Sequence, residues 1–204
     1  ICLKNNVVLV SDEIHFDLVR KNQEHIVINN VDDSFSKNTV ICTAVSKTFN
    51  LAGLQVSNIF IPNPIIRKAF QKRLDAAGYC EVNMLGQHAC QAAYEGGREW
   101  LDQLKVYLKG NLDFTRDFLE KRIPQIKLIE PEGTYLIWLD CRGLGLSESA
   151  LEDLIVNQAK LWLDAGAMFG KVGAGFERIN LTCPRSLLQE ALERLEKAVA
   201  ALTV

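Results

Sequence analysis

Val40-Ile41-Cys42-Thr43-Ala44-Val45-Ser46-Lys47 joins an apolar, β-branched run to a serine and a lysine, and a small-residue turn follows at Ala52-Gly53. Such a run is typical of a strand that is buried on both faces of a parallel sheet. The pattern predicts that Lys47 lies at the carboxyl end of this strand, where desolvation favours the neutral amine. A neutral lysine amine can form Schiff bases with carbonyl compounds. The alternative is a solvated surface lysine before a turn.

A second apolar run, Val7–Val10, ends in a polar segment, Ser11-Asp12-Glu13-Ile14-His15. Open α/β sheets bind ligands outside the carboxyl ends of their strands, so we expect Asp12, His15 and Lys47 to converge on one cleft. A carboxylate there can keep a pyridinium nitrogen protonated, which makes the ring an electron sink. An imidazole there can hydrogen-bond a phenolic oxygen of the same ring. A helix N-cap for Asp12 and an amphipathic surface position for His15 are the alternatives.

The composition indicates a globular protein. The chain has 204 residues, of which 48% are hydrophobic and 24% charged, and its formal net charge is −2. These values give no basis for binding nucleic acid or an anionic membrane, and no apolar stretch is long enough to span a bilayer. The six cysteines are scattered without metal-ligand spacing, which indicates reduced thiols in a cytosolic protein. The start at Ile1 resembles the last turn of a helix capped by Asn5-Asn6, which suggests that an upstream half is missing.

The order of patterns predicts an α/β region followed by an α+β region. Short apolar runs, including Ser57–Ile61, alternate with helical spacing over Ile65–Ala77 and Gly86–Tyr94. One long amphipathic helix then begins at Arg98 and ends before Pro124. We place the domain boundary there, with residues 1–96 in the first domain and 97–204 in the second. In the second domain we expect strands at Lys127–Glu130, Tyr135–Asp140 and Phe176–Thr182, a helix from Ser147 to Asp164 stopped by Gly166, and a final helix opened by Pro184.

Four segments, in order along the whole chain, resemble the fold-type I enzymes that use pyridoxal phosphate, the class I/II aminotransferase superfamily. They are Asp12–His15, Ser46–Leu54, Pro131–Asp140 and Gly175–Leu181. The resemblance implies the C-terminal part of the large domain, with a mostly parallel sheet, followed by the small domain. It also implies pyridoxal 5'-phosphate as cofactor, an amino acid as substrate and a homodimer with sites built from both subunits.

The resemblance implies a role for each candidate residue. Lys47 would form the Schiff base with the cofactor, Asp12 would pair with its pyridine nitrogen, and His15 would lie near its phenolic oxygen. Arg178 would bind the substrate carboxylate, a task that suits its planar guanidinium; a surface strand arginine is the alternative. Ser46 is a candidate contact for the phosphate, or else a turn hydroxyl that bonds the local backbone.

Three positions depart from the transaminase pattern. His15 stands where many transaminases have tyrosine, Gln55 where many have a phosphate-binding arginine, and Ala44 where many have serine. His15 and the run Ala52–Gln55 are similar to the cystathionine β-lyase branch, which cleaves C–S bonds. The departures leave fewer cationic groups to hold the phosphate.

The sequence therefore predicts a C–S β-lyase that releases a thiol, pyruvate and ammonia from cystathionine or cysteine S-conjugates. An aminotransferase is the alternative within the same fold. In this family the N-terminal half supplies the glycine-rich phosphate loop and the aromatic residue that stacks on the ring. We therefore expect the isolated chain to be inactive, and a non-catalytic folding or dimerisation unit is the alternative of another class.

Overall fold

The structure is a computed structural model, and it describes residues 1–20, 23–79 and 81–202. The chain divides into two compact units, Ile1–Gln103 and Leu104–Val204, and the boundary falls within one long helix. In the described residues, no helix combines the length and the apolar character that crossing a membrane requires. Five cysteines are free thiols, and Cys80 lies outside the described residues.

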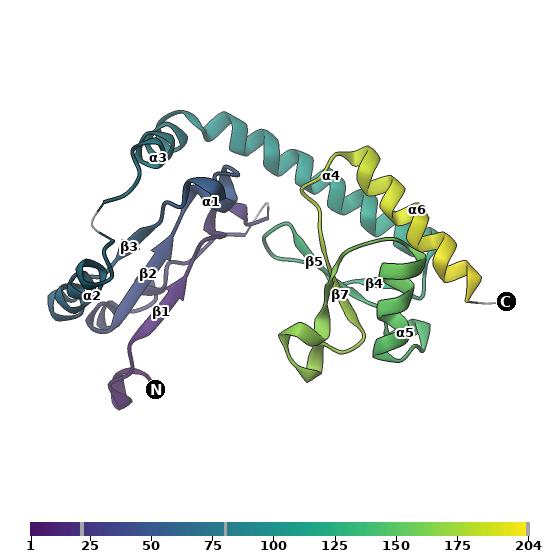
Figure 1. The fold of residues 1–204 in the computed structure, drawn as a ribbon, viewed down its shortest axis with the longest axis horizontal. Coiled ribbons are helices and arrows are strands. Elements are labelled where there is room, and N and C mark those ends of the chain that lie inside the picture. Colours follow the sequence, from purple (N-terminus) through teal and green to yellow (C-terminus); the bar gives the residue numbers. More distant parts are fainter. Residues whose placement is uncertain (21–22, 80, 203–204) are drawn as a thin grey trace. The chain divides into compact units, whose positions relative to one another are not determined.

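The first unit is built on a three-stranded sheet with the order β1-β2-β3, drawn in purple and blue in Figure 1. The strands are β1 (Leu9–Asp12), β2 (Thr39–Thr43) and β3 (Asn58–Phe60). β1 and β2 are parallel, with Asp12 in register with Cys42, whereas β3 runs antiparallel to β2. β2 is buried over its first three residues, as its apolar run predicts. β1 is not buried on both faces as expected, since Val10 on this outer strand is 61% exposed.

The helices α1 (Val45–Thr48), α2 (Pro64–Ala76) and α3 (Met84–Gly96) lie wholly in the first unit. The helical spacing predicts α2 and α3 to within a few residues. Asn63 caps α2 by accepting from the amides of Ile65 and Ile66, and Asn83 caps α3 by accepting from that of Gly86. Side-chain oxygens at this position satisfy amides that have no partner within the helix. Short 3₁₀ turns lie at Leu3–Asn5, Phe16–Leu18, Ile28–Asn30, Asp33–Lys37 and Ala52–Leu54.

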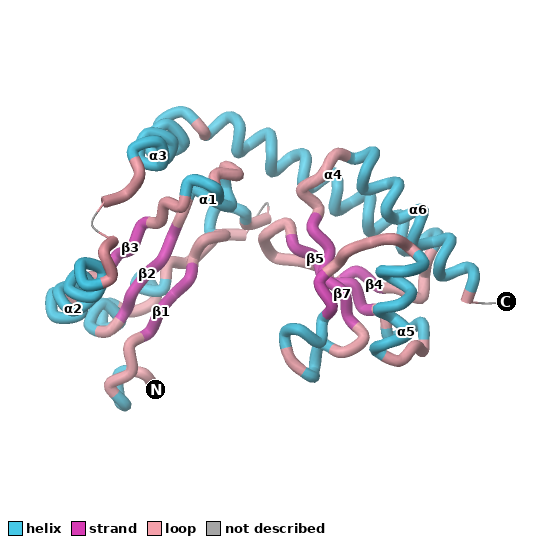
Figure 2. The backbone as a smooth tube through the Cα atoms, viewed as in Figure 1, coloured by secondary structure: helices cyan, strands magenta, loops and turns pink. Residues whose placement is uncertain are grey.

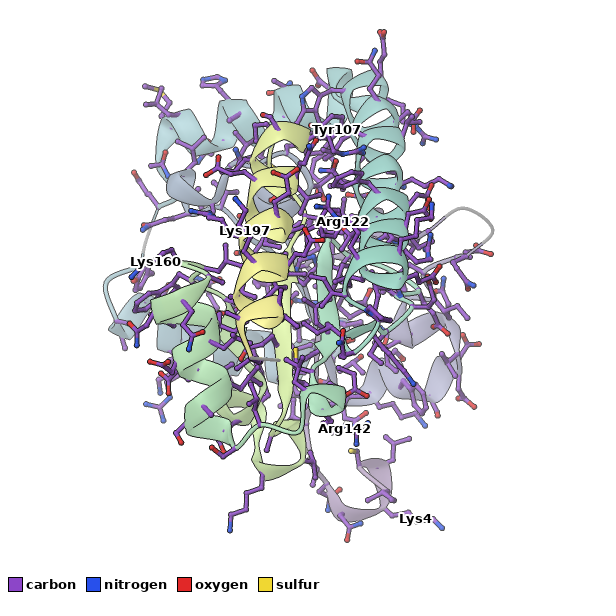
Figure 3. The ribbon with its side chains drawn as sticks, turned by 90° about the vertical axis from the view of Figure 1, so that its right-hand side faces the viewer. Lys4, Tyr107, Arg122, Arg142, Lys160 and Lys197 are labelled. Carbon is purple, nitrogen blue, oxygen red and sulfur yellow. The ribbon has the colours of Figure 1, made fainter. Side chains whose placement is uncertain are left out.

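The long helix is α4 (Arg98–Arg122), as the amphipathic pattern predicts. Within the second unit it packs beside α6 (Arg185–Ala201), and Figure 2 shows both as long cyan coils. Tyr107 and Arg122, labelled in Figure 3, mark two points of contact along this pair. The hydroxyl of Tyr107 accepts from the amide of Arg185 at 2.8 Å, and Nε of Arg122 donates to Oε1 of Glu196 at 2.8 Å.

The second unit contains an antiparallel sheet with the order β4-β5-β7-β6. Its strands are β4 (Lys127–Leu128), β5 (Leu136–Asp140), β6 (Asp164–Ala165) and β7 (Phe176–Asn180). Alternate residues of β5 and β7 enter the core, including Ile137, Leu139 and Ile179. They join fully buried leucines of the helices, among them Leu154 and Leu192. The expected strand positions are therefore confirmed, except that β6 was not predicted.

The predicted helix from Ser147 to Asp164 is wrong in its second half. Ser147 does cap α5 (Glu148–Glu152), accepting from the amide of Ala150. The chain then forms a π-helix at Asp153–Gln158 and leaves the helix at Lys160, whose φ is +54°. A π-helix inserts an extra residue, which rotates the residues after it out of phase. Trp162, which an α-helix continued to Asp164 would turn toward the core, lies after the end of the helix and is 90% exposed.

Candidate active site

Lys47 lies on the short helix α1, four residues after the end of β2 at Thr43. Ala44 is extended and buried, and Val45 and Thr48 then face inward, one turn of helix apart. Because these two positions hold the inner side of the turn, Lys47 faces outward and is exposed. The expectation of a desolvated lysine is therefore wrong for this structure. The expected position after a buried strand is confirmed.

The helix that carries Lys47 is tied to the loop after β1. Thr48, fully buried, donates from its hydroxyl to Oδ2 of Asp17 at 2.9 Å. A hydrogen bond between a buried hydroxyl and a carboxylate fixes both segments, since breaking it would leave a buried polar group without a partner. The loop between Asp12 and Leu18 is thus held against the turn around Lys47.

Asp12 and His15 lie at the same edge of the sheet as Lys47, because β1 and β2 are parallel neighbours. Asp12 is exposed, and its Oδ1 accepts from the amide of Ile14 at 3.2 Å. This is a local turn around the aspartate, not a helix N-cap. His15 is half-buried before the 3₁₀ turn Phe16–Leu18. Ser46 is half-buried beside Lys47.

Glu13, for which no role is predicted from the sequence, is the buried residue of this segment. It is 5% exposed and bonds three groups: Ser11 Oγ at 3.0 Å, the amide of Ile28 at 3.1 Å and Nε2 of His25 at 2.9 Å. Burial alone would raise the pKa of Glu13, but these hydrogen bonds and the attraction of His25 outweigh it and lower the pKa. Glu13 therefore holds the backbone next to Asp12 in place. Strand alternation is the signal that could have found it, since the neighbour of an exposed Asp12 must point inward.

Arg178 lies in the second unit at the centre of β7, in register with Trp138 on one side and Asp164 on the other. Its Nε and Nη2 both donate to Oδ2 of Asp164, at 3.0 and 2.7 Å. The guanidinium carbon lies 4.6 Å from the ring centre of Phe169, and the edge of that ring packs against Trp138. A cation over an aromatic face is stabilised by the ring's charge distribution.

This arrangement orients the guanidinium for a further ligand. A single oxygen of Asp164 occupies the Nε side, and these are the only hydrogen bonds found for the Arg178 side chain within residues 1–20, 23–79 and 81–202. The Nη1–Nη2 side is the edge that can receive a carboxylate through two parallel hydrogen bonds. The side chain is 25% exposed, so it is not the exposed surface arginine of the alternative interpretation. Asp164 was missed because the sequence assigned it to a helix end.

The glycine-rich segment before Arg178 forms two 3₁₀ turns, Gly166–Phe169 and Lys171–Gly173. The turns pack closely: a Cβ on Gly166 would lie 2.1 Å from the carbonyl oxygen of Gly173. Only glycine allows this approach. The turn places Phe169 over Arg178, and Lys171 is exposed.

The candidate residues thus form two groups, one in each unit. Asp12, His15, Ser46 and Lys47 share the carboxyl edge of the β1–β2 pair. Arg178, with Asp164 and Phe169, forms the second group.

Solved structures resemble the chain over nearly its whole length. It superposes on cystalysin from Treponema denticola, described as containing a pyridoxal 5'-phosphate cofactor, with a TM-score of 0.94 and 43% identity. That match covers 98% of this chain and 51% of cystalysin. A PLP-bound putative aminotransferase from Clostridium difficile 630 gives a TM-score of 0.94 and 41% identity, over 97% of this chain and 51% of that one.

Curated proteins also resemble the chain over nearly its whole length. Cystathionine beta-lyase PatB from Bacillus subtilis (strain 168) is 38% identical over 98% of this chain and 52% of its own length. Protein MalY from Escherichia coli (strain K12) is 35% identical over 99% of this chain and 51% of its own. The chain thus spans about half the length of the curated relatives it matches. The family described as aminotransferase class I and II matches residues 1–195. The chain therefore belongs to the aminotransferase class I and II family.

Proposed function

We propose that this chain is the C-terminal half of a pyridoxal phosphate-dependent C–S β-lyase. The enzyme would cleave cystathionine or cysteine S-conjugates to a thiol, pyruvate and ammonia. The observation that supports the proposal is that Asp12 ends β1 and exposed Lys47 follows β2, so that both come after the carboxyl ends of one parallel strand pair. The names of the relatives, several of them cystathionine beta-lyases, support the lyase. An aminotransferase is the second candidate, because the family name and the Clostridium difficile structure suggest it.

The residues at this edge offer partners to the aldehyde and the ring nitrogen of the cofactor, but few to its phosphate. Lys47 offers an exposed amine to an aldehyde, and Asp12 offers a carboxylate oxygen, Oδ2, beyond the one that bonds Ile14. The phosphate has less: the hydroxyl of Ser46 is near, while Ala44 and Gln55 offer no charge. The fit is therefore good for the aldehyde and the ring nitrogen, and we propose that further phosphate contacts come from residues outside this chain.

Each group would have one task in the reaction. Pyridoxal phosphate, when bound, supplies a ring that withdraws electrons from the substrate α-carbon. Lys47 Nζ would hold the cofactor covalently at rest and accept the α-proton once the substrate amine has replaced it. Asp12 would accept the hydrogen bond of the ring N–H and keep that nitrogen protonated. Arg178, oriented by Asp164, would bind the substrate carboxylate.

Cofactor binding tests the first part of the proposal. Pyridoxal phosphate added to the chain should give an absorbance band at about 410 to 430 nm, as expected of a lysine-bound aldehyde. Lys47→Ala should remove the band. Lys68→Ala is the matched control, because Lys68 is an exposed lysine of the same unit. A band that both variants retain would show non-specific lysine modification. No band in any of the three would favour the non-catalytic folding or dimerisation unit.

Product analysis separates lyase from aminotransferase. The lyase releases pyruvate from cystathionine without a 2-oxo acid, whereas amino transfer requires the acceptor. We propose that activity needs the missing half and a homodimer, so the assay belongs to the natural protein. An intact mass near twice 22.9 kDa for that protein would support the missing half. Acceptor-dependent transfer without pyruvate would rule out the lyase.

A further inference from the structure

The second unit has a cavity that the candidate active site does not use. Its volume is about 370 Å³, within the range of small-ligand sites. Three carboxylates line it, those of Glu148, Glu152 and Glu177, together with apolar side chains that include Leu151 and Phe176. Glu177 precedes Arg178 on β7, and successive residues of a strand face opposite sides of the sheet. The Glu177 side chain therefore lies on the face of β7 opposite Arg178.

Glu177 is the buried carboxylate of this cavity. The residue is 4% exposed, and no hydrogen bond or ion pair reaches its side chain from any part of the chain that the structure describes. A buried charge without a partner is costly, and such groups in proteins are normally paired. Within the described residues the Glu177 carboxylate thus has no cationic or hydrogen-bonding partner, and its oxygens are not fully enclosed, so the cavity gives a ligand access to them.

The groups around Glu177 make its negative charge still less favourable. Glu152 on α5 and Asp164 on β6 repel its negative charge, and the thiol of Cys141 after β5 lies near it. Burial, followed by the repulsion of Glu152 and Asp164, raises the pKa of Glu177 to about 7. Two arginines of this sheet region are engaged with other carboxylates. Arg178 pairs with Asp164, and Arg142, labelled in Figure 3, pairs with Asp140.

A metal ion is a poor partner for this site. Within the described residues, no three His, Cys, Asp or Glu side chains are placed to hold one. An ammonium group suits it better, because it brings positive charge and up to three hydrogen-bond donors to a carboxylate. The apolar walls suit an alkyl chain, and Glu148 and Glu152, both exposed, can attract a second ammonium group.

We propose that this cavity binds a small aliphatic amine, with one ammonium group on the carboxylate of Glu177. A linear diamine fits best, its second ammonium lying between Glu148 and Glu152. Binding converts Glu177 to the carboxylate, so amine binding near pH 7 releases a proton from Glu177. The cavity lining shares no residue with the proposed pyridoxal phosphate site or with the group formed by Arg178, Asp164 and Phe169.

The test is calorimetric titration of the full 204-residue chain with 1,4-diaminobutane at pH 7, in two buffers of different ionisation enthalpy. We expect saturable binding of one diamine per chain with release of protons. Glu177→Gln keeps the side-chain size and should weaken binding at least about tenfold, the loss of a charge-assisted contact. Glu190→Gln removes an exposed carboxylate on α6 and should leave binding unchanged. Equal weakening by both variants would mean surface attraction alone and would overturn the proposal.

A second measurement needs no variant. The chain has two methionines, Met168 beside the cavity and Met84 in the first unit. In a chain with ¹³C-labelled methionine methyls, the diamine should shift the Met168 resonance in a saturable way and leave Met84 unmoved. Neither resonance moving, or both moving alike without saturation, would overturn the site.

Discussion

Replacing Glu177 by glutamine should stabilise the protein, and more so at higher pH. Burial beside Glu152 and Asp164 raises the pKa of Glu177 from 4.5 to about 7. The folded state therefore binds more protons than the unfolded state between these pH values. The contribution of protonated Glu177 to the free energy of unfolding is fully present below pH 4.5 and is lost as pH rises through about 7. At ~1.36 kcal/mol for each pH unit, the loss approaches about 3 kcal/mol.

The assay is urea unfolding of the wild type and Glu177→Gln at pH 5, 6, 7 and 8, with Glu190→Gln as control. At pH 5 the free energies of unfolding of wild type and Glu177→Gln should nearly agree. At pH 8 the glutamine variant should be more stable by about 2 to 3 kcal/mol. Glu190→Gln should follow the wild type at every pH, because its carboxylate is exposed. The result that refutes the reasoning is a constant difference across the pH range, or a Glu177 carboxyl that titrates near 4.5 by NMR.

Three further changes test the packing of the second unit, with urea unfolding as the measurement. Leu154→Ala should lower the free energy of unfolding by about 2 to 5 kcal/mol, because Leu154 is fully buried in the core; a loss under 1 kcal/mol would contradict its place there. Asn111→Ala should cost about 1 to 3 kcal/mol, since buried Asn111 donates to the carbonyl of Leu181 at 2.8 Å; no change would mean that water replaces the amide. Gly166→Ala should destabilise the second unit strongly, because its Cβ would meet a backbone oxygen at 2.1 Å. Gly96→Ala is the control, since a Cβ there has free space and the change should be neutral or slightly stabilising. Equal effects of the two substitutions would refute the close approach at Gly166.

The sequence predicts those parts of the fold in which local pattern and tertiary packing agree. α2, α4 and α6 follow helical spacing, and β2, β5 and β7 follow apolar runs, so their bounds lie within a few residues of expectation. The end of the helix after Ser147 could not be predicted, because its apolar positions fit an α-helix as far as Trp162. The π-helix Asp153–Gln158 interrupts the α-helical spacing, and the residue types in this segment do not predict it.

The candidate site was predicted in its residue types but only partly in its environment. Lys47 follows a buried strand as expected, yet the turn of α1 directs it outward. Glu13 escaped notice because its partners, His25 and Ile28, lie 12 and 15 residues away in the sequence. A single sequence gives no sign of such pairings, and charged residues are exposed more often than buried. The roles of Asp12, His15, Ser46, Lys47 and Arg178 stay predictions.

Asp164 interacts with residues on both faces of β7. The sequence could not have indicated this double role. It pairs with Arg178 on one face and raises the pKa of Glu177 on the other. A carboxylate bound to Arg178 would share that guanidinium with Asp164 and leave the charge of Asp164 less neutralised. The repulsion felt by Glu177 would then increase, and its carboxyl would hold a proton more tightly. Carboxylate binding at Arg178 is therefore expected to raise the pKa of Glu177 further, through one aspartate.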